Sequence, residues 1–149
     1  MQLAQELKLT NIHFNDPVPK RQIPGILAAA DVALMTLFKS PLIDIYFENK
    51  LVDYMGAGKP ILAAMDGMQG DIIRQQSAGK VVASFDHAGL ARLVAEAAAA
   101  PAAIAKLGDN GREFAGRQLL LENILATYMG RIADVAKGHA KSMPAINLV

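Results

Sequence analysis

The sequence contains no cysteine and only three histidines among its 149 residues. Without cysteine there are no disulfides, no thiolate metal ligands and no cysteine nucleophile, and a reducing cytoplasm is the expected location. The three histidines are scattered and show no His–Glu spacing of the kind that binds zinc, so no protein-bound metal is expected.

The chain also lacks an excess of one charge and any long apolar run. Its 15 basic and 14 acidic residues nearly cancel, so bulk electrostatics predict binding neither to nucleic acid nor to an anionic membrane. The N-terminus, MQLAQELKLT, carries charges where a signal peptide is apolar, and no run approaches the roughly 20 residues that span a bilayer. We therefore expect a soluble chain that holds any anionic ligand locally. Its 52% hydrophobic content suffices for one packed core.

Short apolar runs alternate with segments of helical period, which is typical of repeated β-α units. This pattern predicts an α/β fold, a Rossmann-like parallel sheet of about four strands with flanking helices. The expected strands are residues 11–14, 32–37, 61–64 and 80–83. Helices are expected over about residues 3–9, 20–30, 49–57, 67–76 and 86–100, from residue 101 onward, and over 119–137. We assign residues 1–137 to the domain and residues 138–149 to a C-terminal tail.

A polar helix start follows the second expected strand. Ligands of parallel sheets bind beyond the strand carboxyl ends, and a helix beginning near Asn49 offers free amides and a positive dipole end to a diphosphate. Asn49 and Asp53 share one face of this helix, whereas Leu51 and Met55 share another that can face the core. The Asp53 carboxylate can accept hydrogen bonds from two ribose hydroxyls, and Lys50 can add a positive charge near the phosphates. Taken alone, Asp53 also fits an ordinary solvated helix position.

The run ENKLVDYMGAGKPILAA, from Glu48 to Ala64, resembles a segment of the retaining GT-B glycosyltransferases grouped as family 4. The preceding run NIHFNDPVPKRQIPGILAAADVALMTL is similar to that family's strand, base-binding turn, helix and next strand, and residues 84–111 resemble two of its later helices. The resemblance covers about residues 3–128. It implies the C-terminal, donor-binding domain of such an enzyme, without its first two strands and without its acceptor-binding domain.

The resemblance also implies roles for individual residues. Asp53 aligns with the second acid of the family's acidic pair, which binds the donor ribose, and it is one carbon shorter than the usual glutamate. Pro17 and Val18 match the turn whose backbone contacts the donor base.

The first acid of that pair, which contacts the donor sugar in the family, aligns with Ile45 in this sequence. Asp44 and Glu48 are neighbours of this position and not matches to it. They are therefore the candidate donor-sugar residues, and sugar recognition departs here from the family pattern.

The predicted function is the donor-binding part of a retaining glycosyltransferase, which transfers a sugar from a UDP- or GDP-linked donor to an acceptor hydroxyl with no further cofactor. The alternative is a non-catalytic or half-site module that binds nucleotide sugars only with a partner chain. A third reading, a flavodoxin-like or receiver-type domain, needs an acidic cluster or phosphate loop after the first strand, where residues 13–17 supply only Asp16.

The expected partners are the nucleotide sugar and further protein. Loss of two strands from the middle of the sheet exposes strand edges and apolar surface. Either the missing N-terminal acceptor domain or self-association through the exposed sheet edge is expected to cover them.

Overall fold

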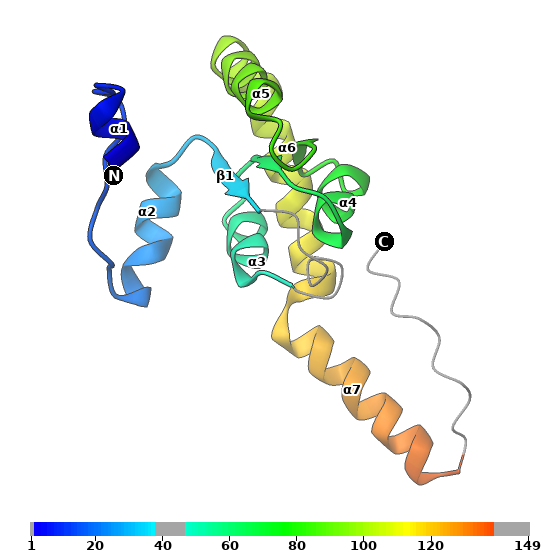
Figure 1. Ribbon diagram of the computed structural model, residues 1–149. Helices are drawn as coiled ribbons and strands as arrows, with labels where there is room; N and C mark the ends of the chain where they lie inside the picture. The colour runs from blue at the N-terminus through cyan, green and yellow to red at the C-terminus, as the bar shows by residue number, and fades with distance from the viewer. Residues whose placement is uncertain (1, 38–46, 139–149) are drawn as a thin grey trace.

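The structure, a computed structural model, describes residues 2–37 and 47–138, and its centre is a parallel sheet. The three strands are β1 (Ala33–Thr36), β2 (Ile61–Ala64) and β3 (Gly79–Val82), in the order β1-β2-β3. Both strand pairs are parallel, with Ala33 opposite Ile61 and Ile61 opposite Gly79. The predicted α/β class with flanking helices is confirmed (Figure 1).

The expected strand at residues 11–14 does not form, so the described residues contain three strands instead of about four. This segment runs irregularly and exposed between α1 (Gln2–Glu6) and the 3-10 helix η1 (Lys20–Gln22). A strand needs a hydrogen-bonded neighbour, and within the described residues β1 pairs only with β2. The apolar pattern of residues 11–14 is thus not enough to form a strand.

The expected helices all appear, with ends displaced by a few residues. Besides α1, they are α2 (Ile23–Ala29), α3 (Asn49–Gly56), α4 (Met68–Gln75), α5 (His87–Ala99), α6 (Pro101–Phe114) and α7 (Leu121–Ala136), with a π-helix, η2 (Ala115–Leu119), between the last two. Asp86 caps α5, as predicted, because the Gly89 N–H donates to its Oδ1 at 2.7 Å.

Two apolar layers cover the sheet, because successive side chains of a strand point to opposite faces. One layer joins the sheet to α3, α4, α6 and η2 through the buried residues Met35, Leu51, Met55, Ile61, Ala63, Met65, Ile72, Ile73, Ala78, Phe114 and Ala115. On the other face, Leu62 packs with Ala97 of α5 and Ile104 of α6. All four residues of β2 are buried, so β2 is the centre of the core.

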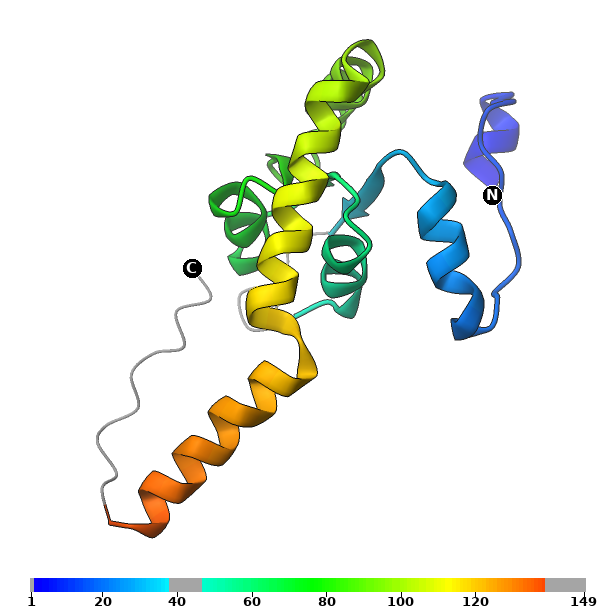
Figure 2. The same cartoon turned by 180° about the vertical axis from the view of Figure 1, so that it is seen from behind.

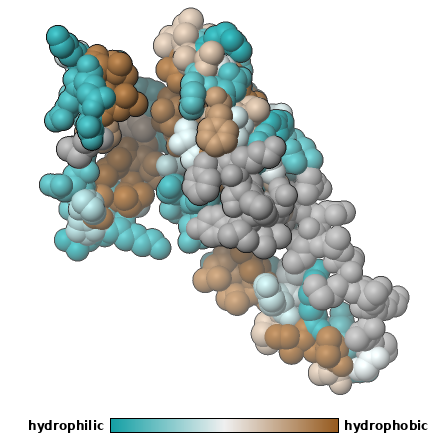
Figure 3. All heavy atoms as spheres, in the orientation of Figure 1, coloured by the Kyte–Doolittle hydropathy of each residue, from teal (hydrophilic) through white to brown (hydrophobic). Residues whose placement is uncertain are grey.

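Large apolar side chains remain exposed on β1, on α7 and on the N-terminal segment. On β1, Ala33 and Met35 are buried but Leu34 is 53% exposed. No residue of α7 is buried, and large apolar side chains are exposed along it, namely Leu121, Leu125, Tyr128, Met129, Ile132 and Val135. Figure 3 shows apolar surface over α7 and on the side of the N-terminal segment that faces the rest of the molecule. These surfaces are of the kind that further protein covers.

No single helix within residues 2–37 and 47–138 is long and apolar enough to cross a membrane. Only a pair of helices bent by 106°, His87–Ala99 with Pro101–Ala136, reaches the required length and composition.

Candidate functional site

Helix α3 has one face in the core and one in solvent. Leu51 and Met55 are fully buried against the sheet. Asn49 and Asp53, on the opposite side, are exposed, as is Lys50. The predicted division of the two faces is therefore confirmed, and the polar residues are accessible to a ligand.

The N-cap residue of α3 does not cap the helix with its side chain. Glu48 is the N-cap residue and has extended backbone angles (φ −75°, ψ 123°), but its side chain makes no capping hydrogen bond. Its carbonyl accepts a bond of 3.1 Å from the Leu51 N–H. The first amides of a helix lack intrahelical acceptors, so this end attracts anions.

Gln69, which sequence analysis missed, holds the backbone at this point. It lies in the first turn of α4, is 1% exposed, and its Oε1 accepts a 2.9 Å bond from the Glu48 N–H. This helix begins after Gly67, whose φ is +84°. The contact joins residues 21 positions apart, and no local pattern in the sequence predicts it.

The charged residues at the start of α3 lie close to one another. Lys50 Nζ is 3.9 Å from Glu48 Oε2, and their side chains are 65% and 18% exposed. Glu48 is thus mostly covered and beside a lysine, while Lys50 extends into solvent. The other predicted donor-sugar residue, Asp44, lies outside the described residues.

The predicted base-binding residues, Pro17 and Val18, lie in an exposed irregular segment just before η1 and α2. The Gln22 N–H bonds to the Pro19 carbonyl at 2.9 Å and starts the helical stretch. Both α2 and α3 begin on the side of the molecule toward which β1 points (Figures 1 and 2). The segment just before α2 and the start of α3 therefore lie on the carboxyl-end side of the sheet.

The turn from α3 to β2, Ala57–Pro60, joins three helices. Gly58, with φ +66°, ends α3 in a left-handed conformation, as predicted. Arg112 of α6 donates from Nη2 to the Ala57 carbonyl at 2.9 Å. Lys59 donates from Nζ to the carbonyls of Ala28 and Ala30, at the end of α2. The sequence did not indicate this contact.

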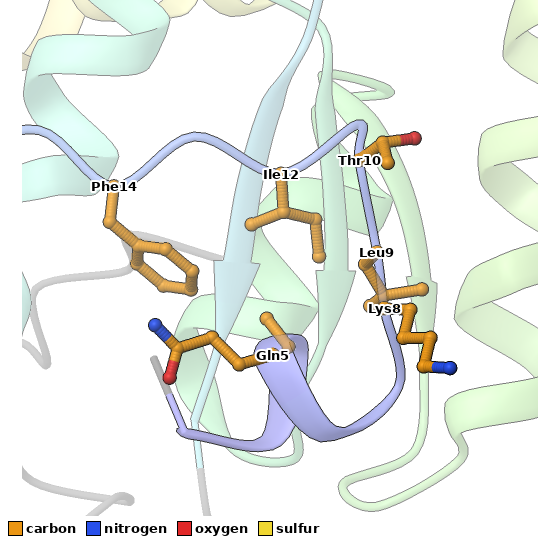
Figure 4. A pocket seen from close by; sticks show the side chains of 7 residues that line it. Gln5, Lys8, Leu9, Thr10, Ile12 and Phe14 are labelled. Carbon is orange, nitrogen blue, oxygen red and sulfur yellow. The ribbon is translucent and has the colours of Figure 1, made fainter.

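An open pocket of about 370 Å³ lies elsewhere, within the N-terminal segment (Figure 4). It is lined by Ala4, Gln5, Lys8, Leu9, Thr10, Ile12 and Phe14. None of the predicted site residues contributes to it. The candidate site is the exposed start of α3 and not this pocket.

The architecture is that of an α/β domain with a parallel sheet whose ligand side is the carboxyl ends of its strands. Comparison with known proteins gives the family: the model of "Glycosyl transferases group 1" matches residues 1–100. The chain belongs to this family. No curated protein matches it.

A solved structure, sucrose-phosphate synthase from Thermosynechococcus elongatus, has a similar fold, with a TM-score of 0.77 at 24% identity. The superposition covers 93% of this chain and 34% of that one. The chain thus has the fold of part of a GT-B donor domain and spans about a third of that enzyme's length. The predicted resemblance to GT-B glycosyltransferases is confirmed.

Proposed function

We propose that this chain binds a nucleoside diphosphate sugar and is the donor-binding part of a retaining glycosyltransferase. The observation that carries the proposal is the start of α3, where the N-cap side chain of Glu48 makes no capping hydrogen bond and Asn49 and Asp53 are exposed on one face of the helix. Membership of the glycosyl transferase family supports glycosyl transfer in general. UDP or GDP is the proposed nucleotide, and an acceptor hydroxyl receives the sugar.

In this proposal, different groups bind the diphosphate, the ribose, the base and the sugar of the donor. The amides at the start of α3, together with Lys50, bind the donor diphosphate. They stabilise the negative charge that develops on the diphosphate as the bond to the sugar breaks. Asp53 accepts hydrogen bonds from the ribose hydroxyls, and the backbone at Pro17 and Val18 contacts the base. Glu48, and Asp44 by sequence, are the proposed donor-sugar residues.

Titration calorimetry of the chain with UDP and with GDP tests this proposal. Asp53→Ala should weaken nucleotide binding by more than about tenfold, because two hydrogen bonds to a charged acceptor are lost. Asp109→Ala, a change at an exposed aspartate of α6, is the matched control and should leave the affinity unchanged. Equal nucleotide affinities for the wild type and Asp53→Ala would show that Asp53 does not contact the nucleotide.

A second candidate is a half-site module that works only when another chain covers its open surfaces. Exposed Leu34 on the edge strand β1 and the apolar face of α7 favour it. The partner is either an acceptor domain or a second copy that pairs through the sheet edge. Light scattering after size exclusion, with an assay of UDP-sugar hydrolysis, separates the candidates. A stable monomer that hydrolyses a UDP-sugar alone would exclude the half-site module.

Two predictions from the sequence stay predictions. The first is the division into a donor domain, residues 1–137, and a tail, residues 138–149. The second is the cytoplasmic location. Trimming the chain after residue 137 tests the first of these. Nucleotide affinity should be unchanged, since the proposed site lies wholly before that point.

A further inference from the structure

Lys59 contacts the end of α2, away from the proposed ligand-binding side. Its ammonium group is 3.1 Å from the Ala28 carbonyl oxygen and 2.8 Å from that of Ala30, the C-cap residue of α2. Carbonyls at a helix C-terminus lack intrahelical donors and carry partial negative charge. A lysine ammonium, with three donors, satisfies two of these carbonyls at once.

The backbone of Lys59 is in turn attached to α3. Its N–H donates to the Tyr54 carbonyl at 2.9 Å, and the Gly58 N–H donates to the Met55 carbonyl, also at 2.9 Å. These are the two hydrogen bonds of a Schellman motif, which fixes the turn at the end of a helix. Lys59 therefore connects the C-terminal end of α3 to the C-terminal end of α2.

The packing of helix α2 is sparse within the part of the chain that the structure describes. None of its residues is buried, whereas α3 buries Leu51 and Met55. A helix of seven residues is about 10 Å long. If the Lys59 contact were lost, a tilt of about 15° around the C-terminal end of α2 would displace its other end by about 2–3 Å, given that length.

The displaced end is the one next to Pro17 and Val18, on the same side of the molecule as the start of α3 (Figures 1 and 2). We infer that Lys59 is a positioning residue: through its hydrogen bonds to Ala28 and Ala30 it sets the distance between the base-binding turn and the phosphate-binding start of α3. This inference rests on the proposed function, because it concerns how the two halves of that site are spaced.

The experiment compares two probes, UDP and inorganic pyrophosphate, by titration calorimetry. Lys59→Met removes the ammonium and retains the apolar stem. It should weaken UDP binding about tenfold, because the population of correctly spaced sites falls, and apparent affinity falls in proportion. Pyrophosphate binding should change by less than about twofold, since that probe needs only the start of α3.

Two further variants separate positioning from general damage. Lys59→Arg keeps a cation with several donors and should recover UDP affinity to within about threefold of wild type. Lys106→Met, at an exposed lysine of α6, should change neither affinity. Hydrogen exchange should accelerate over residues 20–30 in Lys59→Met and stay unchanged over α3 and α6.

Unchanged UDP affinity in Lys59→Met would overturn the inference. So would an equal loss of UDP and pyrophosphate binding, because a general disturbance of the site, and not its spacing, would then be the cause. If the wild type binds neither UDP nor GDP, the proposed function fails first and this inference fails with it. The two failures are distinct, since failure of the proposed function appears in the unmodified chain and failure of this inference appears only in Lys59→Met.

Discussion

Gly108 of α6 lies against the turn that ends α3, and its replacement by alanine tests that packing. A Cβ at this position would meet the carbonyl oxygen of Gly58 and would also crowd Pro60. Gly130, in the middle of α7, is the matched position: a Cβ there meets nothing within 4 Å. Both glycines are inside helices, so Gly130→Ala and Gly108→Ala differ in surroundings and not in local conformation.

The expected magnitudes follow from two opposing effects. Alanine is favoured over glycine inside a helix by about 0.5–1 kcal/mol. Overpacking costs about 1–3 kcal/mol, and the upper half of that range applies at Gly108 because its obstacle is a backbone carbonyl and not a flexible side chain. Gly108→Ala should therefore lower the free energy of unfolding by about 1–2.5 kcal/mol, and Gly130→Ala should raise it by about 0.5–1 kcal/mol.

Urea denaturation followed by circular dichroism measures both changes, and thermal unfolding should show Gly108→Ala lower in Tm by about 2–10 °C. If Gly108→Ala proved as stable as Gly130→Ala, α6 would not lie so close to the Gly58 turn that a Cβ at position 108 meets the Gly58 carbonyl oxygen. The spacing of α6, α3 and β2 would then need another explanation.

Two further predictions concern helix α5. Asp86→Ala removes the acceptor of the 2.7 Å bond from the Gly89 N–H and should lower the free energy of unfolding by about 1 kcal/mol, read from urea denaturation; no change would mean that this cap forms no effective bond in solution. The hydrogen bond from Lys80, 2.7 Å away, and the charge of that lysine lower the pKa of Glu96 below 4.5. A carboxyl group whose pKa is lower in the folded chain than in the unfolded chain stabilises the fold at a pH above its unfolded-state pKa. This stabilisation is lost as the pH falls through its folded-state pKa. The stability advantage of wild type over Glu96→Gln should therefore shrink below pH 4.5; an advantage that stays constant from pH 6 to pH 3 would contradict the assignment.

Much of the fold was predictable because local signals are strong in this chain. Three helix boundaries appear as predicted, because each depends on the conformation of only one or two residues. They are the helix end at Gly58, the cap at Asp86 and the helix start at Pro101. Leu51 and Met55 are buried, whereas Asn49 and Asp53 are exposed. The helical period alone predicts this difference, because it places the two pairs on different faces of α3. The family resemblance was also visible in the sequence, because it rests on a linear motif of consecutive residues.

Pairing and long-range contacts were not predictable in this way. Residues 11–14 have the apolar pattern of a strand, yet a strand exists only with a partner, and within the described residues none is present for them. Gln69 and Lys59 carry no local signal for their contacts, which join residues 21 and 29 or 31 positions apart. The sequence by itself determined the helices, the strands β1, β2 and β3, the polar face of α3 and the family. Only the tertiary structure decided which strands pair and that Lys59 connects α2 to α3, because these depend on segments meeting in space.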